Sequence, residues 1–235
     1  MTIAGAYLLF VFFGLTIMQF LPAVSDRVFY PLKFCYNITQ MFLCAYMAVE
    51  AGVLAYRNNY TLFPYGKTNP FDAANPPLAK LLWLFYISKM LDFFDTFSIV
   101  MQKRFKQLSF LHVYHHSSIF CFYWLNLRRG YDGDIFLTIV LNGAIHTVMY
   151  TYYFLSMHTK DIWWKKYLTV MQMIQFCGMV TQATMMMVND DATFPPRMTQ
   201  LYCVYVISIL ALFMNFFAQS YMPKKKNTSD AKKTA

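Results

Sequence analysis

Seven stretches of about 20 mostly apolar residues dominate this sequence, and each is long enough to cross the hydrocarbon core of a bilayer as a helix. They cover residues 4–22, 32–55, 78–100, 109–127, 134–157, 163–187 and 198–222. Because 58% of the 235 residues are apolar and only 13% are charged, the chain cannot hide this surface in one soluble core. We expect an all-α, polytopic membrane protein, with a seven-helix transmembrane domain over residues 1–222 and a basic tail over residues 223–235.

The basic residues predict the orientation of this domain. Thirteen of the 20 Lys and Arg residues fall in one set of loops and the tail, six fall in the other set, and Lys89 lies within a span. The richer set is expected on the cytosolic side, which places the C-terminus in the cytosol and the N-terminus in the lumen. The net charge of +9 comes largely from these loops and the tail, so it requires no nucleic acid.

The tail and one sequon suggest a compartment. The ending Lys232-Lys233-Thr234-Ala235 has the pattern of a dilysine signal that returns membrane proteins to the endoplasmic reticulum from a cytosolic tail. A lysine-rich tail that is merely solvated, or that touches anionic lipid, would have the same composition. Asn59 begins the sequon that would face the lumen, so it is the expected glycosylation site.

Polar side chains recur at helical spacing inside four of the predicted spans. Ionisable groups at such depth cost about 2.5 to 3.5 kcal/mol even on lenient scales, and therefore indicate a functional site. At a rise of 1.5 Å per residue, they fall about 6 to 24 Å below the cytosolic edge. We expect a tunnel that opens to the cytosol and suits a substrate with a charged head and an acyl tail. The residues are Lys89, Asp92, Asp95, Thr96, His112, His115, His116, Asn142, His146, Tyr150, Gln172 and Gln175.

Several explanations of these groups stay open. Lys89, Asp92 and Asp95 are close enough on one helix to form a purely structural ion-pair cluster. Three or four histidines can hold one zinc ion, as in a metal-binding membrane protein of the hydroxylase or transporter type. Neutral imidazoles can instead act as base or acyl acceptor, while amides and hydroxyls stabilise an oxyanion. A seven-span receptor shares the topology, but does not explain imidazoles and carboxylates at one depth.

Four motifs resemble, in order and spacing, the signature boxes of the endoplasmic-reticulum fatty-acid elongases, the ELO family. They are Lys89-x-x-Asp92-x-x-Asp95-Thr96, His112-Val113-Tyr114-His115-His116, Asn142-x-x-x-His146-x-x-Met149-Tyr150-x-Tyr152-Tyr153 and Thr169-x-x-Gln172-x-x-Gln175. The family usually has Glu where this chain has Asp92. Gln107, five residues before His112, resembles the branch of the family that extends polyunsaturated chains.

The resemblance implies a condensing enzyme, a very-long-chain 3-oxoacyl-CoA synthase, that joins acyl-CoA to malonyl-CoA with loss of CO2. It uses no cofactor and no metal, and its partners are membrane lipid and the ketoreductase, dehydratase and enoyl reductase of the cycle; a homodimer stays open. By resemblance, His115 accepts the acyl group, His146 assists proton transfer, and His112 and His116 orient the site. The implied substrate-binding residues are Lys89, Asp92, Asp95, Asn142, Tyr150, Gln172 and Gln175. The candidates for CoA phosphate are Lys103, Arg104, Lys106, Lys165 and Lys166.

Overall fold

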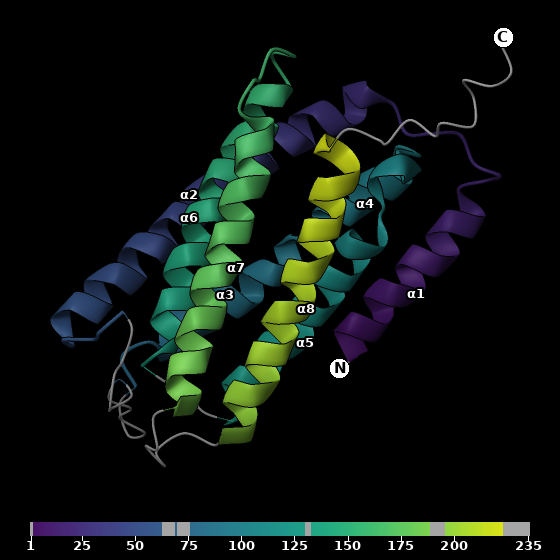
Figure 1. Cartoon of the computed structure of the whole chain (residues 1–235). Helices are drawn as coiled ribbons and strands as arrows, with labels where there is room; N and C mark the ends of the chain where they lie inside the picture. Colours follow the sequence, from purple (N-terminus) through teal and green to yellow (C-terminus); the bar gives the residue numbers. More distant parts are fainter. Residues whose placement is uncertain (1, 63–68, 70–75, 130–132, 189–195, 223–235) are drawn as a thin grey trace, which may run out of the picture.

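Helices make up all the regular structure that the computed structural model describes, namely residues 2–62, 69, 76–129, 133–188 and 196–222 (Figure 1). The expected all-α class is confirmed. The elements are α1 (Thr2–Ile17), α2 (Asp26–Arg57), α3 (Ala79–Leu91), α4 (Phe93–Met101), the 3-10 turn η1 (Phe105–Gln107), α5 (Phe110–Arg129), α6 (Ile135–Ser156), α7 (Lys165–Val188) and α8 (Pro196–Tyr221).

The helices have the length and surface of a multi-pass membrane protein. Three of those described, α2, α6 and the part of α8 over Arg197–Tyr221, are long and apolar enough to cross a membrane by themselves. Large apolar side chains also cover the outside of the bundle, as at Phe12 of α1 and Val204 of α8, which are 67% and 66% exposed. Helices that are apolar on their outer faces as well as their inner ones are typical of a lipid environment.

The helix in the expected span over 78–100 is interrupted at Asp92. α3 ends at Leu91 and α4 begins at Phe93, while the backbone N–H of Asp92 still donates to the Ser88 carbonyl at 3.2 Å. Asp92 is only 2% exposed, and its carboxylate meets Lys89 one turn earlier and Gln40 of α2. The carboxylate is buried at the interruption, where these two side chains hold it.

Close approach of α2 and α6 forms the most extensive helix pair of the bundle. A Cβ atom on Gly143 would lie 2.9 Å from the Cys44 carbonyl oxygen and 3.0 Å from the Cβ of Ala48. Small residues let membrane helices approach in this way, and the contact energy comes from packing and not from the exclusion of water. The second pair is α7 with α8, and α1 lies at the edge of the bundle against α4 and α5 (Figure 1).

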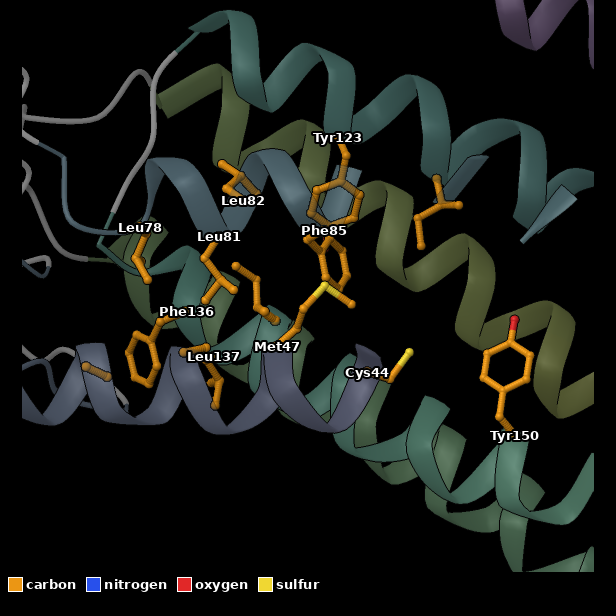
Figure 2. Close-up of a cluster of buried hydrophobic side chains, with 14 residues drawn as sticks. Cys44, Met47, Leu78, Leu81, Leu82, Phe85, Tyr123, Phe136, Leu137 and Tyr150 are labelled. Atoms are coloured by element: carbon orange, nitrogen blue, oxygen red, sulfur yellow. The ribbon is translucent and has the colours of Figure 1, made fainter. Parts of the chain in front are cut away.

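An apolar core supports the polar groups from one side. Figure 2 shows Met47, Phe85 and Tyr123 converging from α2, α3 and α5, and the rings of Phe85 and Tyr123 lie 4.7 Å apart. Phe85 stands one turn before Lys89, and Tyr123 stands two turns after His115 or His116 on α5. The core therefore fixes the two helices that carry the lysine and the histidines.

The helix ends alternate between the two ends of the bundle. The turn from α6 to α7 and the end of α8 lie at one end, and α1 begins at the other (Figure 1). This arrangement agrees with the two sets of loops predicted from the sequence. The tail over 223–235, with its dilysine ending, lies outside the described residues.

Candidate active site

A buried lysine links α3 to α6. Lys89 is 1% exposed, and its Nζ lies 3.3 Å from the Asp92 Oδ2 and donates to the Asn142 Oδ1 at 3.1 Å. The same ammonium stands 4.4 Å from the centre of the Phe85 ring. The predicted ion pair is therefore present. It is more than a pair within one helix, because Asn142 ties it to α6 next to the candidate catalytic residues.

Two tyrosines and two carboxylates form a network beside this lysine. The Tyr150 hydroxyl lies 3.2 Å from the Asp92 Oδ1, 3.1 Å from the Asp95 Oδ2 and 3.0 Å from the Tyr36 hydroxyl. Gln40 donates its amide to the Asp92 Oδ1 at 2.6 Å, and Tyr36 donates to the Asp95 Oδ2 at 3.1 Å. The sequence reasoning missed Tyr36 and Gln40. An amide in the apolar stretch 32–55 was the signal that could have identified Gln40.

The histidine motif forms the predicted strip on α5. The rings of His112 and His116 lie 4.4 Å apart, and that of His115 stands almost perpendicular to His116 at 5.3 Å. The His112 Nε2 lies 2.7 Å from the Thr96 Oγ1, which in turn lies 3.0 Å from the Tyr7 hydroxyl of α1. This contact fixes His112. Within the described ranges, no group of three or more His, Cys, Asp or Glu side chains could hold a metal ion.

His115 lines a cavity between α5, α6, α7 and α8. Asn142 of α6 and Gln175 of α7 line the same cavity, and α8 contributes Tyr205 and Ile209. Most of the remaining wall is aromatic or aliphatic. A largely apolar cavity with a few convergent polar groups is the usual form of a small-molecule site.

Three polar atoms around the histidines have no hydrogen-bond partner in the described protein: the Nδ1 atoms of His116 and His146 and the Oε1 of Gln175. Each is buried. Unpaired buried polar atoms are rare in proteins, because each costs about 1 to 3 kcal/mol. Of the three, only Gln175 also lines the cavity beside His115, so a molecule bound there can supply the missing partner of its Oε1.

Of the predicted site residues, His115, Asn142 and Gln175 line this cavity, and the others do not. His146 is buried on α6 one turn beyond Asn142, with its ring 6.0 Å from that of Tyr150. Gln172 is half-buried, and its amide lies 3.9 Å from the Met149 sulfur. His115, Asn142 and Gln175 thus contribute polar groups to the cavity wall, whereas His146 and Gln172 are not part of that wall.

The basic candidates for CoA binding lie in two segments of the chain. One runs from the end of α4 through η1, and the other is the start of α7. Lys103 is half-buried and has a φ of 53°, while the Arg104 guanidinium already pairs with Asp26 of α2 at 2.6 Å. The others are exposed and accessible to a phosphate: Lys106, Lys165 and Lys166.

The predicted glycosylation site is accessible. Asn59 follows the end of α2, is exposed, and adopts a left-handed backbone with a φ of 53°. Asparagine tolerates this conformation better than most residues. Among the described residues nothing covers its side-chain amide, so a transferase can reach it.

Comparison with known proteins matches almost the whole chain. Residues 1–229 fit the model of the GNS1/SUR4 (ELO) family. Over 225 residues the chain is 37% identical to very long chain fatty acid elongase 2 of Mus musculus, covering 93% of this chain and 74% of that protein. It is 31% identical to elongase 4 of Homo sapiens over 230 residues, covering 96% and 72%, and 34% identical to human elongase 5 over 221 residues, covering 93% and 72%.

Proposed function

Because the chain belongs to the ELO (GNS1/SUR4) family, we propose that it catalyses the condensing step of fatty-acid elongation. Its relatives are very long chain fatty acid elongases, so it is an enzyme of fatty-acid elongation and lipid biosynthesis. The substrates of the step are acyl-CoA and malonyl-CoA. Family membership favours this function over a metal-binding membrane protein or a seven-span receptor.

One observation supports the proposal most directly: His115, Asn142 and Gln175 share one largely apolar cavity. The imidazole supplies a nucleophile, and the amides supply donors for a carbonyl oxygen. The apolar wall suits an acyl chain. We further propose that this cavity belongs to a tunnel that opens to the cytosol.

The proposed reaction proceeds in two steps. A nitrogen of His115 attacks the thioester carbonyl of acyl-CoA, so that a C–N bond forms, the C–S bond breaks, and CoA leaves as a thiolate that takes a proton. Malonyl-CoA then loses CO2, and the resulting enolate carbon attacks the acyl group. The new C–C bond releases the imidazole and gives a 3-oxoacyl-CoA two carbons longer. His146 assists proton transfer. No cofactor or metal takes part.

The residues near His115 have supporting roles in this proposal. Asn142 and Gln175 donate hydrogen bonds to the carbonyl oxygen that becomes negative. His112 and His116 orient the site around His115. Gln172 reaches the substrate only by a change of side-chain conformation. The polar end of the malonyl group, or the side chains that surround it, is positioned by Lys89, Asp92, Asp95 and Tyr150. Lys103, Lys106, Lys165 and Lys166 meet the CoA phosphates, together with Arg104 once it releases Asp26.

The cellular setting is part of the same proposal. We expect the protein in the endoplasmic reticulum membrane, with its N-terminus in the lumen and its C-terminus in the cytosol. Reduction and dehydration of the product belong to a ketoreductase, a dehydratase and an enoyl reductase. A preference for polyunsaturated chains is proposed because Gln107, which is exposed at the end of η1, resembles that branch of the family.

Expression in membranes without elongases of their own tests the function. With labelled malonyl-CoA and a panel of saturated and unsaturated acyl-CoAs, the unaltered chain should form labelled 3-oxoacyl-CoA. His115→Ala and His146→Ala should each lower this product more than tenfold while the protein still accumulates. His158→Ala is the matched control, because that histidine is exposed in a loop. Near-normal turnover in either of the first two variants removes the role assigned to that residue.

A further inference from the structure

Helix α1 packs against the bundle through one narrow stripe of residues. Its buried side chains are Ala4, Tyr7 and Val11, which are three and four residues apart and therefore share one face. At Gly14, the next position of this stripe, a Cβ atom would lie 2.9 Å from the Val100 Cγ1 of α4, so the absence of a side chain lets the two helices approach. The Tyr7 hydroxyl is thus the only polar side-chain group that α1 buries.

The ring and the hydroxyl of Tyr7 have separate partners on α4. The ring stacks on that of Phe93, with 4.4 Å between their centres, and the hydroxyl lies 3.0 Å from the Thr96 Oγ1. Thr96 is fully buried, and its Oγ1 lies 2.7 Å from the His112 Nε2. A row of three polar groups therefore runs from α1 through α4 to the histidine motif of α5.

The direction of these two hydrogen bonds follows from the number of protons available. The Thr96 hydroxyl has one proton, so it donates to His112 or to Tyr7 but not to both. If it donated to Tyr7, the phenol proton would have no acceptor in the described part of the chain, and Tyr7 is only 5% exposed. Such a donor is rare, because it loses its bonds to water and gains none. Tyr7 therefore donates to Thr96, and Thr96 donates to His112.

This direction determines which ring nitrogen of His112 carries the proton. In a neutral imidazole one nitrogen is a donor and the other is an acceptor. Because Nε2 accepts the Thr96 proton, the imidazole proton lies on Nδ1. Within the described residues Nδ1 makes no hydrogen bond, and His112 is only half-buried, so this N–H can donate to a bound molecule.

We infer that Tyr7 of α1 is a positioning residue of the active site: through Thr96, it holds His112 in the tautomer whose Nδ1–H is available to the substrate. The inference rests on the proposed function, in which the acceptor is an oxygen of acyl-CoA or malonyl-CoA. A donor that is held in place stabilises negative charge as it develops, because it does not have to reorient during the reaction. Helix α1 thus contributes to the chemistry although it lies at the edge of the bundle.

Tyr7→Phe tests this role, because it removes the hydroxyl and keeps the ring that stacks on Phe93. In membranes that contain the full chain, kcat for 3-oxoacyl-CoA formation should fall about fivefold, while KM for acyl-CoA should change by less than about twofold. Tyr7→Phe combined with Thr96→Val should lower kcat only as far as Thr96→Val alone, since Tyr7 acts through Thr96. Tyr46→Phe is the matched control, because Tyr46 is exposed on α2.

Two further measurements separate positioning from packing. Val11→Ala loosens the same stripe and keeps the hydroxyl, so it should lower Tm and leave kcat within about twofold. The nitrogen NMR spectrum of the full chain, labelled at histidine, should show His112 unprotonated at Nε2, and Tyr7→Phe should populate both tautomers. The signal of His112 is the one that disappears in His112→Gln.

A His112 that carries its proton on Nε2 in the unaltered chain overturns the inference, because the hydrogen bonds then run in the opposite direction. An unchanged kcat or tautomer in Tyr7→Phe, or an equal loss of kcat in Val11→Ala, also overturns it. If the unaltered chain forms no 3-oxoacyl-CoA from any acyl-CoA, the proposed function fails, while the spectrum still decides whether Tyr7 sets the tautomer. Should Tyr7→Phe fail to accumulate, the spectrum of the unaltered chain decides.

Discussion

Replacement of Lys89 by methionine tests whether the buried ion pair holds the bundle together. The change keeps most of the side-chain volume and removes Nζ, which now lies 3.3 Å from Asp92 and donates to Asn142. Asp92 is 2% exposed and would become a buried carboxylate without its cation. Breaking a buried pair from one side costs about 3 to 5 kcal/mol.

This magnitude is large against a total stability of about 5 to 15 kcal/mol for a typical domain. At about 2 to 4 °C per kcal/mol, Tm should fall by about 6 to 20 °C. Thermal unfolding of the purified protein in detergent measures the change. Lys80→Met is the matched control, because Lys80 is exposed on the same helix.

A second substitution sharpens the test. Lys89→Met combined with Asp92→Asn removes both charges, so it should recover at least about 1 kcal/mol relative to Lys89→Met alone. A Tm for Lys89→Met within 2 °C (about the expected effect of 1 kcal/mol) of that for Lys80→Met would contradict the structural role. Loss of product in that case would assign the ammonium to substrate binding.

Three further predictions concern other parts of the bundle. Gly143→Ala should destabilise the protein by about 1 to 3 kcal/mol through overpacking against α2, whereas Gly52→Ala, which meets nothing within 4 Å, should be neutral or stabilising in the same unfolding assay. Thr96→Val removes the 2.7 Å contact to His112 and should lower kcat about tenfold, with recovery in Thr96→Ser; equal activity in all three forms would dismiss this contact. Asn59→Gln should abolish a glycosidase-sensitive mass shift, and a shift that persists would place the glycan elsewhere.

Helical periodicity predicted the side-chain contacts that form within a single helix. The seven apolar stretches coincide with helices, except that one is broken, and the spacing of Lys89 and Asp92 gave the ion pair. The spacing of His112 and His116 gave two rings in contact for the same reason. In these cases the partners are three or four residues apart, so the geometry of one helix decides the contact.

Helical periodicity could not predict the contacts between different helices. Gln172 and Gln175 are three residues apart, yet only Gln175 lines the cavity, because the rotation of α7 against its neighbours selects one of them. Tyr36 and Gln40 reach the carboxylates from α2, which carries no motif. The break at Asp92 likewise depends on partners from other helices. A periodic pattern contains no information on how one helix is rotated against its neighbours. The four ordered motifs indicated only that their polar residues belong to one site.

The interrupted helix at Asp92 has a consequence for how the chain is made. α3 and α4 have 13 and 9 residues, carry Lys89, Asp92 and Asp95, and therefore partition poorly into lipid as an isolated segment. Asn142 and Tyr150, which bond to these groups, are synthesised some 50 residues later. We therefore expect this segment to stay beside the insertion machinery during translation until α6 emerges.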